Sequence, residues 1–177
     1  SFGAGRLLLL HGIELEIKAD GTLDFSDEVL ASLDLVVASV HVGLRQPRAQ
    51  ITARLLNAIH NPHVDIIGHP SGRLLPDREP SDIDWEQIFA AARRTGVALE
   101  INANARRLDL NDVHARRAQE MGILLSVNTD AHRVDQLARS EFGVATARRA
   151  WLQSAQVINT WDPVKLRAWL QTRGSFA

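Results

Sequence analysis

The sequence contains no cysteine, a single methionine, Met121, and only two lysines among its 20 basic residues. Without cysteine there is no disulfide framework, no thiolate zinc site and no thiol nucleophile. A metal ion would therefore need nitrogen and oxygen ligands. Arginine suits phosphate contacts, but genome composition is the better explanation of its excess. Because the chain starts at Ser1 and not at a methionine, we expect it to be processed or cut from a longer protein.

Long apolar segments and a strong net charge are also absent. The stretch Leu33–Leu44 is about half as long as a membrane-spanning helix needs to be and contains Asp34 and His41. Ser1–Leu10 has no signal-peptide pattern. The net charge of −1 gives no global attraction to nucleic acid, although it does not exclude a local basic groove. These features predict a soluble cytoplasmic protein with no membrane partner.

What is present is typical of one compact domain, with 177 residues, 45% of them hydrophobic and 23% charged. Strands are expected over residues 13–17, 35–40, 64–68, 97–101 and 123–127. Helices are expected over residues 27–32, 48–60, 85–95, 111–121, 135–140, 144–151 and 163–172, with a loop at 71–80. Strands that alternate with single helices imply parallel crossovers, so the predicted class is α/β. Five strands do not close an eight-stranded barrel, which again indicates that something precedes Ser1.

Polar residues follow the predicted strands at their C-terminal ends, where active sites of parallel α/β folds lie. They are His41, His69, Asn102, Asp130 and His132, with Glu14 on the first strand. Imidazole and carboxylate ligands suit zinc, manganese and iron. Taken singly, each has a plainer interpretation: a hydrogen-bonded loop histidine, a helix cap at Asp130, or an exposed strand face at Glu14. Their joint placement favours a metal site.

The other histidines lie before a strand, near helix ends or within a helix, so we predict structural or solvated roles for them. These are His11, His60, His63 and His114.

Several short motifs resemble those of the polymerase and histidinol phosphatase (PHP) domain. They are Gly12-Ile13-Glu14, Ser39-Val40-His41, Gly68-His69-Pro70-Ser71-Gly72-Arg73-Leu74-Leu75, Glu100-Ile101-Asn102-Ala103, Arg107-Leu108-Asp109-Leu110 and Asn128-Thr129-Asp130-Ala131-His132. Their order and spacing resemble most closely the PHP domain at the C-terminus of bacterial family X DNA polymerases. The resemblance covers residues 12–151.

The resemblance implies a distorted (β/α)7 barrel that holds up to three divalent ions, Mn²⁺ or Zn²⁺. Carried over to this chain, Glu14 is the bridging carboxylate, and His41, His69, Asp130 and His132 are metal ligands. The family's opening His-x-His motif and its Thr-Asp-His strand are absent. The chain is therefore expected to be a single partial domain over 1–177 with the C-terminal five strands of the barrel. Its motif-bearing part is 12–151, and C-terminal helices fill 152–177.

The implied function is that of a metal-dependent phosphoesterase, a 3'-5' exonuclease with related phosphatase activity in DNA repair. Its partners would be DNA or another phosphoester and the polymerase domains of the same longer chain. Arg73 is predicted to clamp a phosphate, with a structural ion pair as the alternative, and Asn102 to orient a ligand or substrate. We expect this isolated chain to be inactive. The competing interpretations are a non-catalytic PHP scaffold or DNA-binding module, and a free-standing histidinol-phosphatase-like enzyme.

Overall fold

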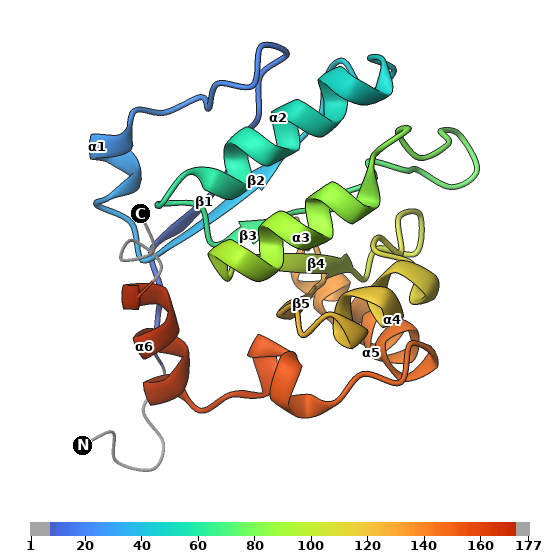
Figure 1. Cartoon of the computed structure of the whole chain (residues 1–177). Helices are drawn as coiled ribbons and strands as arrows, with labels where there is room; N and C mark the ends of the chain where they lie inside the picture. The colour runs from blue at the N-terminus through green and yellow to red at the C-terminus, as the bar shows by residue number, and fades with distance from the viewer. Residues whose placement is uncertain (1–7, 173–177) are drawn as a thin grey trace.

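A computed structural model shows a five-stranded parallel sheet in the order β1-β2-β3-β4-β5 (Figure 1). The strands are β1 (Gly12–Glu16), β2 (Leu35–Ser39), β3 (Ile66–Ile67), β4 (Ala98–Asn102) and β5 (Leu125–Asn128). The α/β prediction with five parallel strands is confirmed. The structure describes residues 8–172; residues 1–7, where no signal peptide was predicted, and 173–177, the end of the predicted C-terminal helices, lie outside it.

The helices are α1 (Asp27–Leu30), α2 (Arg48–His60), α3 (Trp85–Thr95), α4 (Asp112–Glu120), α5 (Ser140–Arg149) and α6 (Pro163–Thr172), with 3-10 segments η1 (Val134–Arg139), η2 (Ser154–Gln156) and η3 (Ile158–Thr160). Asn111 caps α4, because its side chain accepts the amide of His114 at 2.8 Å. Helix α5 begins before residue 144, its predicted start, and so includes Gly143. A Cβ there would lie 2.5 Å from Cγ1 of Val127, so the glycine lets α5 approach β5 closely.

Successive strand residues face opposite sides of the sheet, and the two sides differ. On one side, Val36, Ala38, Leu99 and Ile101 join the main core with residues of α2 and α3, which cross the same face in Figure 1. On the other side the apolar residues lie at the start of the strands. They are Leu35, Val37, Ile66 and Ala98, and they pack with Ile158, Trp161, Leu166 and Trp169 from η3, α6 and the turn between them.

The same side of the sheet becomes polar toward the C-terminal ends of the strands. Glu14, Ser39, Glu100 and Asn102 lie there, and the last three are buried. A buried polar surface costs free energy unless its groups are hydrogen-bonded, so this end of the sheet is where a site is expected. Among residues 8–172, no helix has the length and apolar character that crossing a membrane requires.

Candidate metal centre

Glu14, on β1, comes together with His41 and His69, which follow the neighbouring strands β2 and β3. Nε2 of His69 lies 3.1 Å from Oε1 of Glu14, and Nε2 of His41 lies 3.6 Å from the same oxygen. In the described part of the chain, this is the group of three potential ligands whose donor atoms all lie within 4.8 Å of one another. The sequence prediction that these residues converge therefore agrees with the geometry.

These separations fit two nitrogens and one oxygen around a single cation. Tetrahedral bonds of about 2.0–2.1 Å place neighbouring ligand atoms about 3.3 Å apart. The two nitrogen–oxygen distances of 3.1 and 3.6 Å fall on either side of that value. The donor set of two imidazoles and one carboxylate suits zinc or manganese and needs no thiolate.

Glu16 holds the ring of His41 in the orientation that a metal ligand needs. Its Oε2 lies 2.7 Å from Nδ1 of His41, and the backbone amide of His41 donates to the same carboxylate at 3.0 Å. Because Nδ1 is engaged, the imidazole can keep its proton there and present Nε2 to a cation. Buried Arg54, from α2, lies 3.5 Å from Oε1 of Glu16 and holds that carboxylate in turn.

Glu14 is ionised over the whole neutral range. The hydrogen bond from His69 lowers the pKa of Glu14 to about 2 against the opposing effect of burial, and the Ser39 hydroxyl, which donates to Oε1 at 2.8 Å, contributes. Burial of the ring pushes the pKa of His69 down, but the hydrogen bond to Glu14 and the charge of Glu100 outweigh it, so the net shift is upward. A cation would replace this proton between the two residues.

Asp130 and His132 form a second group beyond the end of β5 and are not part of the triad in the described chain. Nδ1 of His132 lies 2.9 Å from the carbonyl oxygen of Asp130, which leaves Nε2 free on a ring that is 80% exposed. Asn102 donates to Oδ2 of Asp130 at 3.3 Å and to Oε2 of Glu100 at 3.2 Å. Asn102 therefore lies between the second group and the buried carboxylate of β4.

Arg73, the predicted phosphate clamp, uses its guanidinium inside the protein. Its Nε donates to the carbonyl of Arg107 at 2.6 Å, and its Nη2 donates to the carbonyl of Leu108. These bonds support the segment that carries Arg107. Nε of Arg107 lies 3.5 Å from Asp130, and its Nη1 is buried with no hydrogen-bond partner among the described residues. Arg107 thus has an unused donor beside a predicted ligand.

Glu16, Ser39, Glu100 and Arg107 have roles that no sequence pattern predicted. Ser39, Glu100 and Arg107 do lie within the motifs of the resemblance, but no role was attached to them there. A general signal did exist for Glu100, because it is a charged residue within the otherwise apolar run of residues 97–101.

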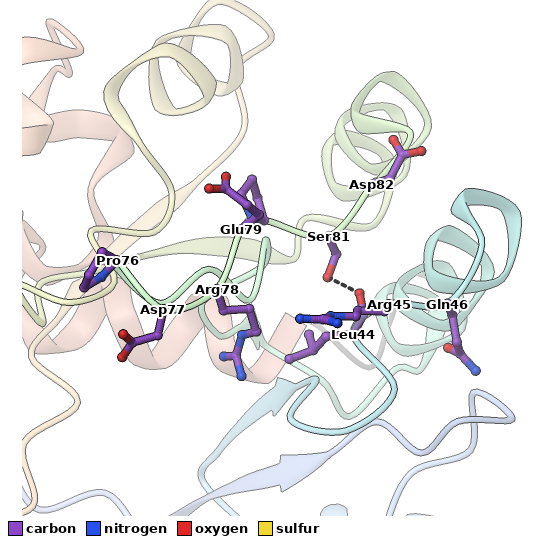
Figure 2. Close-up of a pocket in the computed structure, with 10 residues that line it drawn as sticks. Leu44, Arg45, Gln46, Pro76, Asp77, Arg78, Glu79, Ser81 and Asp82 are labelled. Carbon is purple, nitrogen blue, oxygen red and sulfur yellow. Dashed lines mark hydrogen bonds between the residues drawn. The ribbon is translucent and has the colours of Figure 1, made fainter.

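A cavity of about 390 Å³ lies beside the loops that follow β2 and β3 (Figure 2). Its charged residues are Arg45, Asp77, Arg78, Glu79 and Asp82, so both signs are present. Figure 2 shows the Ser81 hydroxyl bridging the loops through its bond to the Leu44 carbonyl, at 2.9 Å. None of the predicted ligands lines this cavity, and its mixed charge does not favour an anion. The strand ends remain the candidate site.

Two kinds of known protein are similar to the chain. The DNA polymerase/3'-5' exonuclease PolX of Bacillus subtilis (strain 168) is 44% identical over 163 residues, which are 92% of this chain and 29% of that protein. A probable phosphatase of Thermoanaerobacter sp. (strain X514) is 33% identical over 175 residues, with 93% of this chain and 69% of the relative covered. A probable phosphatase of Shewanella sp. (strain ANA-3) is 31% identical over 175 residues, with 67% of the length of that relative covered. No protein-family model matches the chain.

The chain is an α/β protein with a parallel sheet, and the names of its relatives, "phosphatase" and "exonuclease", both denote hydrolysis of phosphoester bonds. More particularly, the chain belongs to the family of these probable phosphatases, and it spans less than a third of the PolX relative.

Proposed function

We propose that the chain is the catalytic part of a metal-dependent PHP phosphoesterase, in which five strands of a (β/α)7 barrel carry Glu14, His41, His69, Asp130 and His132 as ligands for Mn²⁺ or Zn²⁺. The observation that carries the proposal is the convergence of two histidine nitrogens on one ionised carboxylate oxygen, with one histidine held by a second carboxylate. A carboxylate on the second ring nitrogen of a histidine is common around catalytic metals.

Each residue has a task in this proposal. Glu14 stays charged at neutral pH and so can bind cations without first losing a proton. His41 offers Nε2 because Glu16 occupies Nδ1. In this proposal the Nη1 of Arg107, which has no hydrogen-bond partner among the described residues, donates to a phosphoryl oxygen, while Arg73 supports the Arg107 backbone. The ions, when bound, supply the positive charge that stabilises a phosphoryl group under attack by water.

The substrate that we propose is DNA, hydrolysed from its 3' end in a bacterial family X polymerase during repair, with the polymerase domains in the same longer chain. The similarity to PolX over 92% of the chain supports this choice. The second candidate is a phosphomonoesterase, which the probable phosphatases support because they are covered over about two thirds of their length.

The test uses the full-length protein with Mn²⁺ and a single-stranded oligonucleotide labelled at its 5' end, in parallel with p-nitrophenyl phosphate. We expect stepwise shortening of the oligonucleotide, and His69→Ala or His132→Ala should reduce it by at least about 100-fold with the fold retained. His11→Ala is the matched control and should be fully active.

Three other results have clear meanings. Hydrolysis of p-nitrophenyl phosphate alone would favour the phosphomonoesterase. A folded protein that binds no metal and hydrolyses neither substrate would contradict the proposal and favour the scaffold interpretation. Full activity of both ligand variants would show that the site is elsewhere.

A further inference from the structure

The carboxylate of Glu100 lies deep in the polar end of the sheet and is only 5% exposed. It accepts the backbone amide of His69 at 2.5 Å, Nδ2 of Asn102 at 3.2 Å and Nδ2 of Asn128 at 2.9 Å. These donors belong to the end of β3, to β4 and to the end of β5. One side chain therefore ties together the ends of three strands.

Two of the predicted ligand residues have unusual backbones, and both are connected to this carboxylate. His69 has φ of 26° and Asp130 has φ of 51°, a region that residues other than glycine seldom adopt. Glu100 holds His69 through its amide directly, and it holds Asp130 through Asn102, whose Nδ2 also donates to Oδ2 of Asp130 at 3.3 Å. Such backbones persist only where surrounding contacts enforce them.

Packing alone does not require a carboxylate at this position. Taking a carboxylate out of water costs free energy that its hydrogen bonds must offset. An apolar side chain would pack on this strand without that cost but would leave the His69 amide and two side-chain amides without acceptors. The arrangement is thus better explained by what Glu100 holds than by packing.

We infer that Glu100 is a positioning residue that couples the Glu14–His41–His69 group to the Asp130–His132 group, so that both bind divalent cations as one centre. The inference rests on the proposed metal-binding function. It assigns Glu100 no direct contact with metal or substrate: its hydrogen bonds set the backbone of His69 and, through Asn102, the carboxylate of Asp130.

The hydrogen-bond pattern predicts which substitutions can replace Glu100. A glutamine can accept the His69 amide and Asn102 with its single oxygen, while its own amide donates to Asn128 once the Asn128 amide has flipped. The Ser126 hydroxyl, now accepting from Asn128 at 3.2 Å, can donate after that flip. Glutamine therefore preserves the connections, and alanine removes all of them.

The experiment is a Zn²⁺ titration by calorimetry of the metal-free full-length protein and of Glu100→Gln, Glu100→Ala and Asn102→Ala. We expect Glu100→Gln to bind within about threefold of the wild type. Glu100→Ala and Asn102→Ala should each lose about 10- to 100-fold in affinity. Asp65→Asn is the matched control, because Asp65 is also buried and accepts a backbone amide, from Val36, at the other end of the sheet; its affinity should not change.

Hydrogen exchange of the His69 amide, resolved by mass spectrometry, gives a readout that does not depend on metal. Protection should be lost in Glu100→Ala and kept in Glu100→Gln and Asn102→Ala. Should Glu100→Ala fail to fold, Asn102→Ala and Glu100→Gln still decide the question.

The inference is overturned if Asn102→Ala binds Zn²⁺ as the wild type does, or if Glu100→Gln loses as much affinity as Glu100→Ala, since charge and not hydrogen bonding would then be responsible. A wild-type protein that binds no Zn²⁺ would instead contradict the proposed function.

Discussion

Among single residues outside the ligand set, Glu16 holds the candidate centre through His41. Its carboxylate receives the ring of His41, the amides of His41 and Val42, and the guanidinium of Arg54. In the sequence it is simply the second acidic residue of an alternating strand. The motifs of the resemblance do not include it, so its role became visible through contacts with residues 25 and 26 positions away.

Replacing Glu16 by alanine should weaken Zn²⁺ binding by about 10- to 100-fold, because the His41 ring loses the acceptor that fixes its tautomer and orientation. Glu86→Ala is the control: it removes an exposed carboxylate that pairs with Arg117, and it should leave the affinity unchanged. Competition titration with a chromogenic Zn²⁺ chelator measures both. Equal affinities in the two variants would contradict a role for Glu16 in orienting His41.

The stability of the protein should depend on pH through Asp109. Burial raises the pKa of Asp109 against the opposing hydrogen bond from Ser71, so the folded state holds its proton to higher pH than the unfolded chain does. Between the two pKa values the folded protein binds more protons, and its stability falls as pH rises through that window. The cost is fully present above the folded pKa and absent below the unfolded one.

Asp109→Asn removes this titration. We therefore expect the free energy of unfolding of the variant, minus that of the wild type, to become more positive as pH is raised from about 3.5 to 7. Urea unfolding at several pH values measures the difference. A difference that is constant over this range would show that Asp109 keeps an ordinary pKa in the folded protein.

At the scale of elements, the close approach of β2 and the end of β3 depends on Gly68. A Cβ at this position would lie 2.3 Å from Oγ of Ser39 and 3.0 Å from Cγ1 of Val37. Ser39 is the residue that donates to Glu14, so the glycine also makes room for the triad. A glycine is needed here because there is no room for a Cβ atom, and not because of its φ, which is not in the left-handed region.

Gly68→Ala should therefore destabilise the fold by about 1–3 kcal/mol and weaken Zn²⁺ binding as Ser39 is displaced. The clash is shared with Ser39, so the double variant Gly68→Ala with Ser39→Gly should lose less stability than the two single variants together. Urea unfolding of the four proteins measures the coupling. Strict additivity would argue that the two residues do not compete for the same space.

Elements were predictable where a local pattern determines them. Alternation identified the first strand and short apolar runs identified the others, caps such as Asn111 set helix starts, and the strand-end rule located His41 and His69. Glu100 and Asp109 could not be assigned roles in this way, because their partners are 31 and 38 residues away along the chain. Local patterns carry no information on which distant amide a buried carboxylate will accept.

At the scale of the whole molecule, metal binding should appear as added stability. A ligand that binds only the folded state at 100 times its Kd contributes about 2.7 kcal/mol, or a rise in Tm of about 5–10 °C for a chain of this size. Saturating Zn²⁺ should produce that rise in the wild type and in His11→Ala, but little or none in His41→Ala. Differential scanning fluorimetry measures it, and an equal rise in His41→Ala would remove His41 from the ligand set.

The strand order, in which every strand pairs with its nearest neighbour in sequence, also bears on how the chain acquires its fold. Each new pairing closes a loop containing only one helix, so the entropic cost of each step is similar and moderate, unlike that of parallel sheets whose strand order is shuffled. Helix α6 is the exception, since the Trp169 indole donates to the carbonyl of Gly96, 73 residues earlier. The sheet can thus assemble progressively as the chain leaves the ribosome, with the C-terminal helix docking last.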